Sequence, residues 1–540
     1  MDHRNPAIAS PRDSDARPPG LVSGEGGGEP ERLSVWVWAV PIAILAAVGG
    51  VLLWRDGSHF LALLRFPYEW DEDEGFAIYF AQRILAGKTI YGDMNSLPMM
   101  SAIYPPVHHA IVALFVAGLG GTLQAGRLVS MLATAGTCAV AVAAVAQETR
   151  RWTLVLLAAV LVLGSSYVVV WGPLARADSL MVFLLMAGFL LVRQYPRSRA
   201  ALVLGLLLLL AACYTKYQAA ILVPAAFWHI LRHNRRAAVL SAACFGVAGL
   251  AVLAWLTRWS GGWFWQNTVS VLATQYDMEL FRDKAYDFLI THPLVIAGGL
   301  GWLACCLYGR RLDLWGAFAA MSILIVLSAA HAGSAINYFL PPILAGAIGT
   351  CLVADRLVQA LPVRWTARAT WVLALGLLVR GAVWTDSIRT PAAADQEAGD
   401  RILGFVRAVQ GDVLTERRIM FSILAGREPQ MDFCLLYFVN EADRHAAAEA
   451  AKGGRAGEAV RRWDPAEIVR AIREKRYPLF VFAGELIPPD MQEAVVRHYR
   501  PLDDRQNVMS HWRDRGAMLK IIMNNWHGEN VYSLAVPFGK

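Results

Sequence analysis

Long apolar runs divide most of this chain into regular segments. Runs such as residues 35–54, 154–171 and 237–257 contain no charged residue. Their lengths approach or reach the roughly 20 apolar residues that a membrane-spanning helix needs. The pattern predicts spans in eleven places: residues 35–54, 126–147, 153–171, 174–193, 200–215, 217–232, 237–257, 293–308, 313–330, 337–354 and 366–384.

Basic residues gather in short loops between these runs, as they do in the cytoplasmic loops of membrane proteins. The loops with this character cover residues 150–151, 193–199, 232–236, 310–311 and 356–368. All five fall on one side of the membrane if residues 105–121 do not cross it. That run opens with two prolines and two histidines and is shorter than a span, so we interpret it as a re-entrant or peripheral helix.

The polar ends of the chain predict two further regions. Residues 1–33 are rich in Pro, Gly, Arg and Asp, which is typical of a disordered tail, here on the cytoplasmic side. Residues 34–384 form the predicted membrane domain, and residues 385–540 form a small soluble domain outside the cytoplasm.

The C-terminal region alternates helical and strand patterns, which predicts an α/β domain. Helical periodicity covers residues 395–409 and 491–498, and residues 476–482 form a short apolar run typical of a buried strand. Residues 521–537 predict a closing hairpin that turns near residues 527–530.

Composition supports a membrane protein and excludes some other classes. Of the 540 residues, 56% are hydrophobic and 17% are charged, against roughly 45–50% and 25% in soluble proteins. The net charge of +7 comes with the basic loops and does not indicate nucleic acid. Six of the seven cysteines lie in or beside apolar runs, and no CxxC motif occurs, so we expect neither a disulfide framework nor a cysteine metal site.

An acidic cluster follows the first apolar run. Five carboxylates lie within residues 69–74, a segment that includes Asp71, Asp73 and Glu74. Packed near a medium of low dielectric constant, some of these carboxylates would have a raised pKa, which suits a general base. The alternative is an ordinary solvated acidic loop.

Two further groups of charges lie at predicted span ends. Arg176 and Asp178 open the span at residues 179–192, where Asp178 caps a helix or Arg176 binds a phosphate or the acidic loop. Lys216 lies in a tight turn, where a lysine either extends toward the membrane surface or holds a phosphate.

A third candidate region is the loop of residues 258–292, which mixes aromatic and charged residues. Its tryptophans suit a sugar or lipid headgroup, and equally an aromatic belt at the membrane interface. Arg282 and Lys284 are better candidates for binding phosphate because they lie away from the bilayer core. The adjacent His108 and His109 are a weak indication of a metal, and no HExxH, P-loop or GxSxG motif occurs.

Seven short motifs occur in a fixed order along the chain. They are Asp73-Glu74-Gly75, Tyr91-Gly92-Asp93, Tyr104-Pro105-Pro106, Gly126-Arg127-Leu128, Arg176-Ala177-Asp178, Thr215-Lys216 and Asn337-Tyr338. In order and spacing they resemble the GT-C superfamily of integral membrane glycosyltransferases, near the bacterial lipid A aminoarabinose transferases and the protein O-mannosyltransferase-like group. Residues 413–432 also resemble the region after the spans in these proteins, and the resemblance covers roughly residues 35–440.

The resemblance implies a fold and a candidate site. The fold is an all-α polytopic membrane domain of the GT-C type, with about eleven spans and a small C-terminal α/β domain. The implied catalytic carboxylates, led by Asp73, are Asp73, Glu74, Asp71 and Asp178. The implied ligands of the donor phosphate are Lys216, Arg282 and Arg176, and the implied pocket residues are Tyr104, His108, His109, Asn337 and Tyr338.

The resemblance also implies a reaction. Members transfer a sugar with inversion from a polyprenyl-phosphate donor outside the cytoplasm. The expected acceptor is an envelope glycolipid, polysaccharide or protein at the outer face of a bacterial cytoplasmic (inner) membrane. Tyr104 stands where the aminoarabinose transferases carry lysine, which favours the broader group. We expect no resident cofactor and no metal site, although the acidic loop leaves a divalent cation open.

Two other classes of protein remain as alternatives. A transporter or flippase would place its binding groups near the bilayer midplane, whereas the charged groups here gather at span ends. A non-catalytic envelope-assembly protein would use the C-terminal domain for binding alone.

Overall fold

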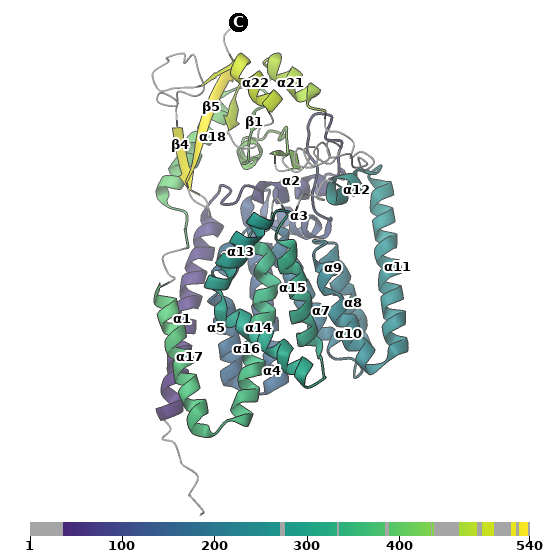
Figure 1. Ribbon diagram of the computed structural model, residues 1–540. Helices are drawn as coiled ribbons and strands as arrows, with labels where there is room; N and C mark the ends of the chain where they lie inside the picture. The colour runs from purple at the N-terminus through teal and green to yellow at the C-terminus, as the bar shows by residue number, and fades with distance from the viewer. Residues whose placement is uncertain are drawn as a thin grey trace, which may run out of the picture.

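The computed structural model places a helical bundle beneath a small α/β domain (Figure 1). It describes residues 36–270, 276–331, 334–383, 388–433, 435–436, 464–482, 489–501, 520–524 and 529–537. The N-terminal tail predicted over residues 1–33 lies outside the described residues.

Every apolar run predicted as a span forms one or two helices of the bundle. These helices are α1 (Trp36–Arg65), α4 (Leu123–Thr149), α5 (Trp152–Leu163), α6 (Ser166–Trp171), α7 (Ala177–Val192), α8 (Arg199–Cys213), α9 (Ala219–Leu222), α10 (Pro224–His233), α11 (Arg235–Trp259), α14 (Pro293–Tyr308), α15 (Leu314–Ser328), α16 (Leu340–Ala360) and α17 (Val363–Val383). The first run continues beyond its predicted end. Helix α1 extends to Arg65, and Arg55 and Asp56 within it pair with each other at 2.7 Å.

Fewer helices than expected meet the requirements for a span by themselves. In the described part of the chain, α1, α4, α11 and the segment Ile336–Ala360 are long and apolar enough to cross a bilayer. A fifth span results if Met278–Thr291 and Pro293–Tyr308, which meet at a bend of 94°, are counted as one. Other apolar helices have 10–17 residues, so the count of eleven spans stays a prediction.

The basic loops lie together at one end of the bundle, opposite the α/β domain (Figure 1). Arg151 pairs with Asp355 at 2.7 Å, and Arg193 pairs with Glu148. Arg232 donates a hydrogen bond to the carbonyl oxygen of Leu312 at 2.7 Å. This arrangement agrees with the expectation that these loops share one side of the membrane.

Short helices cover the other end of the bundle. They are α2 (Glu74–Leu85), α3 (Val107–Leu119), α12 (Trp263–Trp265), the π-helix η1 (Gln266–Ser270), α13 (Met278–Thr291) and the 3₁₀-helix η2 (Ile336–Phe339). With 13 residues, α3 is about 20 Å long and too short to span the roughly 30 Å of a hydrocarbon core.

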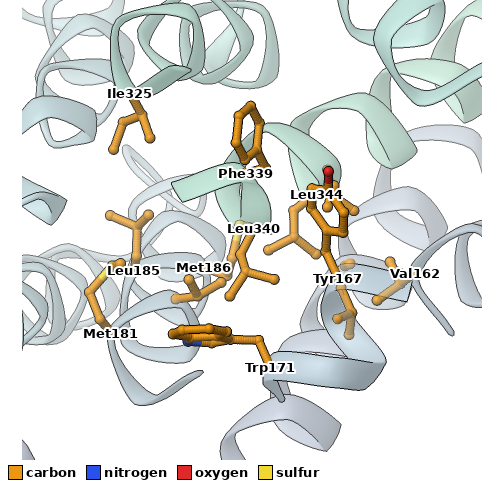
Figure 2. Packing of buried hydrophobic residues seen from close by; sticks show 14 of the residues in the cluster. Val162, Tyr167, Trp171, Met181, Leu185, Met186, Ile325, Phe339, Leu340 and Leu344 are labelled. Carbon is orange, nitrogen blue, oxygen red and sulfur yellow. The ribbon is translucent and has the colours of Figure 1, made fainter. Parts of the chain in front are cut away.

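The core of the bundle brings the ends of several helices to one place. Figure 2 shows Trp171, Met186 and Leu340 in this core, with Tyr167 and Phe339 nearby. The rings of Tyr167 and Phe339 lie 5.9 Å apart between centroids. This packing fixes the end of α6 and the short helix η2 beside the start of α7, where two predicted site residues lie.

The C-terminal domain is built on one mixed sheet. Its strands are β1 (Leu414–Thr415), β2 (Phe480–Phe482), β3 (Tyr499–Pro501), β4 (Lys520–Asn524) and β5 (Glu529–Pro537). The sheet order is β1-β2-β5-β3, with β4 also paired to β5. Only β1 and β2 are parallel among the described pairs; β5 is antiparallel to β2, β3 and β4.

The remaining helices of this domain are α18 (Ala393–Ala408), α19 (Met420–Leu424), α21 (Ala466–Arg473) and α22 (Pro489–His498). The helices predicted at residues 395–409 and 491–498 and the strand within 476–482 form as expected. The predicted hairpin forms from β4 and β5. Its turn begins in residues outside the described part of the chain.

Candidate active site

The acidic loop is held by a buried ion pair. Arg127 of α4 donates to Glu74 from Nε at 2.8 Å and from Nη2 at 2.7 Å, and neither side chain is exposed. Arg127 also donates to the carbonyl oxygens of Leu63, Phe66 and Tyr68. Glu74, predicted among the catalytic carboxylates, is therefore committed to holding the end of α1 and the start of α2 in place.

The ionised form of Glu74 is stabilised inside the protein. Burial by itself would raise its pKa, but Arg127 and the backbone N–H groups of Ala175 and Trp70 lower the pKa below its ordinary value. Glu69 lies beside it and accepts hydrogen bonds from the N–H groups of Gly75 and Met420. Burial raises the pKa of Glu69 well above its ordinary value. Glu69 thus joins α2 to α19 of the C-terminal domain.

Asp71 and Asp73 converge on one guanidinium. Arg176 donates to Asp71 at 2.7 Å and also to Asp73, and its Cζ lies 5.2 Å from the ring centroid of Trp171. The expectation that the acidic loop is a solvated charge run is wrong, because most of its carboxylates are buried or paired. Arg176, predicted as a phosphate ligand, instead neutralises and orients Asp71 and Asp73.

A second charged cluster surrounds Asp178 in the first turn of α7. Its carboxylate accepts from Lys216 Nζ at 2.6 Å, from Asn337 Nδ2 at 2.9 Å and from Trp171 Nε1 at 3.1 Å. The interpretation of Asp178 as a helix cap is wrong, because Arg176 is the N-cap residue and makes no side-chain capping bond.

Lys216 belongs to the interior of this cluster. Its ammonium lies 4.8 Å from the ring centroid of Tyr104 and 5.6 Å from that of Tyr338. Its side chain is 2% exposed, so the interpretation of Lys216 as extending toward the membrane surface is wrong. The structure thus brings five predicted residues together: Tyr104, Asp178, Lys216, Asn337 and Tyr338.

A small cavity, with about 30 Å³ of space accessible to water, lies between α2, α3 and the start of α7. Its lining residues are Asp73, Phe76, Ala77, Phe80, Ile103, Tyr104, His108, His109, Ala175, Arg176, Ala177 and Asp432. Asp73, Tyr104, His108, His109 and Arg176 were all predicted as site residues, and here they line one space.

Arg282, also predicted as a site residue, belongs neither to this cavity nor to the charged clusters around Arg176 and Asp178. It lies on α13 with its side chain 71% exposed and within 3.6 Å of Glu279 and Asp283. A phosphate would have to compete with water and with these two carboxylates for the guanidinium of Arg282. Its neighbour Lys284 donates to carbonyl oxygens of Ala329 and Ser334 instead.

The C-terminal domain supplies residues that sequence reasoning missed. Asp432 lines the cavity, and Arg417 pairs with Glu72 at 2.5 Å. Arg418 donates to the carbonyl oxygen of Glu69 at 2.7 Å. The resemblance at residues 413–432 was the available signal, but it did not identify individual residues.

Four carboxylates of the acidic loop are paired with arginines. Within the ranges that the structure describes, no three His, Cys, Asp or Glu residues are grouped to hold a metal ion. Asp71, Glu72, Asp73 and Glu74 each face an arginine instead.

The fold is similar to that of several solved structures, and in the described part of the chain four helices, or five with the bent pair, are long and apolar enough to cross a membrane, which is typical of a multi-pass membrane protein. One similar structure is ArnT from Cupriavidus metallidurans bound to undecaprenyl phosphate, with a TM-score of 0.51 and 14% identity over 93% of this chain and 98% of that chain. Another is the oligosaccharyltransferase AglB from Archaeoglobus fulgidus in complex with an inhibitory peptide and a dolichol-phosphate. There the TM-score is 0.50 with 11% identity, over 89% of this chain and 75% of that chain. At these identities the likeness establishes the fold.

Comparison with protein-family models gives no match, and no curated protein sequence matches the chain.

Proposed function

We propose that this protein is an inverting glycosyltransferase that moves a sugar from a polyprenyl-phosphate donor to an acceptor hydroxyl in the cell envelope. The observation that carries the proposal is the placement of Asp73. Its carboxylate lines the cavity at the start of α2 and is oriented there by Arg176. The GT-C fold supports a lipid-linked donor, because similar structures are bound to undecaprenyl phosphate or dolichol-phosphate.

The proposed step uses Asp73 as a general base. The carboxylate takes the proton of the acceptor hydroxyl while the hydroxyl oxygen forms a bond to C1 of the sugar. The bond from C1 to the phosphate oxygen breaks, and its electron pair leaves with the polyprenyl phosphate. Phosphate is a weak base, so this step needs no strong general acid. Attack opposite the leaving group inverts the configuration at C1.

Lys216 is the proposed stabiliser of the leaving phosphate. A buried cation is effective against developing negative charge because water does not screen it. Asp178 and Asn337 hold Lys216 beside Tyr104, which lines the cavity. Arg282 has no part in the proposal, because its side chain is exposed on α13.

We also propose that the cavity faces away from the cytoplasm, in a bacterial inner membrane. The support is that basic and acidic residues lie at opposite ends of the bundle. The basic loops occupy one end, and the acidic loop with the C-terminal domain occupies the other (Figure 1). Basic loops favour the cytoplasmic side.

Asp73→Asn tests the function directly. A positioned general base typically contributes about 10²–10⁴-fold to a rate. We expect a loss of that size in the purified full-length variant, measured with undecaprenyl-phosphate-linked sugars and envelope extracts, with insertion and melting temperature retained.

Asp283→Asn on α13 is the matched control, because its side chain is 69% exposed. Mass spectrometry of envelope lipids and glycans, with and without the gene, identifies the product. An Asp73→Asn variant that restores the missing glycan at the normal rate would contradict the proposed function.

A further inference from the structure

Two adjacent histidines at the start of α3 are buried without all the hydrogen bonds that they could make. His108 is 1% exposed and His109 is 4% exposed. Nε2 of His108 and both ring nitrogens of His109 have no hydrogen-bond partner among the described residues. Buried polar atoms are nearly always paired in folded proteins, so each such nitrogen requires an explanation.

Both histidines line the cavity that contains Asp73, next to apolar walls. The ring of His109 lies edge-on to Phe80 at 5.2 Å between centroids, and Phe80 stacks with Phe76 at 6.2 Å. His108 lies on the side toward the charged clusters, where it interacts electrostatically with Asp178, Arg176 and Lys216. The cavity therefore has aromatic walls, and two imidazole rings with buried, unpartnered nitrogens are among its lining residues.

The two rings are uncharged at neutral pH. Burial lowers the pKa of His108 to about 4, and burial lowers the pKa of His109 well below its ordinary value. A neutral imidazole offers one N–H donor and one acceptor nitrogen. A hydroxyl group likewise both donates and accepts. A phosphate lacks the proton that an acceptor nitrogen requires, and an ammonium has no lone pair to accept a hydrogen bond from an imidazole N–H.

From this geometry we propose that His108 and His109 bind hydroxyl groups of a neutral sugar and thereby determine which sugar enters the cavity. Aromatic walls suit the C–H face of a sugar ring, and the imidazoles satisfy its hydroxyls. The inference rests on the proposed function for the presence of a sugar, and it deepens that function by naming the substrate class. The two histidines discriminate between sugars, whereas Asp73 takes the proton.

The test measures binding, so that it does not depend on turnover. Purified full-length protein is titrated with undecaprenyl phosphate, with undecaprenyl-phosphate-linked neutral hexose or pentose, and with an undecaprenyl-phosphate-linked 4-amino sugar. Melting temperature and Kd are recorded for each ligand. We expect the neutral sugars to bind more tightly than both the lipid phosphate alone and the amino sugar.

His108→Phe and His109→Phe keep a ring of similar size and remove the hydrogen bonds. Each lost neutral hydrogen bond should weaken binding of the neutral-sugar ligand about 2- to 12-fold, with binding of undecaprenyl phosphate unchanged. His109→Gln should restore part of the loss because its amide can donate and accept. The matched control is His229→Phe on α10, since His229 is also buried with an unpartnered Nε2 but does not line this cavity.

The possible outcomes separate this inference from the proposed function. Equal affinity for neutral-sugar ligand in wild type and both phenylalanine variants overturns it, and so does tighter binding of the amino sugar. An absence of any sugar-dependent gain over undecaprenyl phosphate overturns it as well. If the histidine effect appears but Asp73→Asn keeps full transfer activity, the sugar site stands and the proposed general base fails.

Discussion

At the scale of single residues, a buried ion pair determines the position of the acidic loop that contains part of the candidate site. Glu74 and Arg127 are fully buried and joined by two hydrogen bonds. Removing one member of such a pair leaves the other charged and uncompensated, which typically destabilises a protein by about 3–5 kcal/mol. The pair therefore controls the position of the whole acidic loop.

Glu74→Gln keeps the size of the side chain and removes its charge. We expect a loss of about 3–5 kcal/mol in stability, because Arg127 remains buried without its counter-charge. Thermal unfolding in detergent, monitored by tryptophan fluorescence, measures this loss of stability. Glu279→Gln is the control, since the Glu279 side chain is 80% exposed. Equal melting temperatures for Glu74→Gln and wild type would show that the pair contributes little.

Glu72 predicts a pH dependence of stability. Its pKa is raised to about 7, mainly by burial, with Arg417 opposing the shift and Asp71 and Asp73 adding to it. The folded chain then binds more protons than the unfolded chain between about pH 4.5 and 7, so the free energy of unfolding falls as pH rises through that window. Each unit of pKa difference corresponds to about 1.4 kcal/mol.

Glu72→Gln resembles the protonated side chain at every pH. The melting temperature of this variant minus that of wild type should therefore increase between pH 5 and pH 8. Differential scanning fluorimetry across that range measures the difference. A difference that decreases with pH would mean that the ion pair with Arg417 outweighs the burial of Glu72.

The sequence indicated which oppositely charged residues lie close together, whereas it did not indicate which charged residues are exposed. The sequence identified Asp73, Arg176, Asp178 and Lys216, and the structure joins them in two neighbouring clusters. Arg282 has the same chemistry as Arg176, and only its place on the exposed face of α13 excludes it from the cavity.

At the scale of elements, α14 and α16 pack with their backbones nearly in contact. A Cβ added at Gly346 would lie 2.2 Å from the carbonyl oxygen of Val295, and one at Gly298 would lie 2.6 Å from the backbone of Thr350. Small residues permit such close approach between helices in membranes, where van der Waals packing contributes strongly to association.

Gly346→Ala should separate α14 from α16 and destabilise the bundle by about 1–3 kcal/mol, which is typical of overpacking. The measurement is thermal unfolding in detergent or lipid nanodiscs. Gly246→Ala on α11 provides the comparison, because a Cβ there meets no atom within 4 Å. If both variants have the melting temperature of wild type, the close approach of α14 and α16 is not required for stability.

The helices themselves follow from the apolar runs, whereas their ends do not. The predicted run at residues 217–232 divides at Pro224 into α9 and α10. The run at residues 153–171 divides after Gly164, where Ser165 caps α6. These breaks depend on local backbone bonding, which hydrophobicity alone does not reveal.

At the scale of the whole molecule, the C-terminal domain and the loop after α1 form one layer. The N–H of Met99 donates to the carbonyl of Gln430 at 2.9 Å, and the N–H of Asp432 donates back to the carbonyl of Met99 at 2.8 Å. Arg418 reaches the carbonyl of Glu69 and lies 5.1 Å from the ring centroid of Tyr532 in β5. The domain thus completes the wall of the cavity.

Arg418→Met should loosen this layer without unfolding the bundle. Loss of a charge-assisted hydrogen bond is worth about 1.5–3 kcal/mol, so amide exchange in β1 and in residues 66–75 should accelerate about 10- to 100-fold. Hydrogen–deuterium exchange with mass spectrometry measures it. Arg497→Met on α22 serves as the control, since its side chain is 69% exposed. Unchanged exchange in both variants would show that other contacts hold the domain.

The arrangement of the whole chain was only partly predictable. The pattern of strands and helices indicated an α/β domain after the last apolar run, and the domain forms. The contact of this domain with the acidic loop and α2 depends on side-chain pairs whose members lie more than 300 residues apart in the sequence. Examples are Glu72 with Arg417 and Tyr79 with Glu428. No local pattern in either segment indicates its partner.

The late position of Asp432 in the chain has a consequence for biogenesis. The ribosome completes α17, which ends at Val383, well before it synthesises Arg417 or Asp432. A nascent polypeptide that ends at α17 still has an open cavity wall, and its acidic loop lacks the contact between Glu72 and Arg417. The wall of the cavity is therefore completed only after the last helix of the bundle has been synthesised.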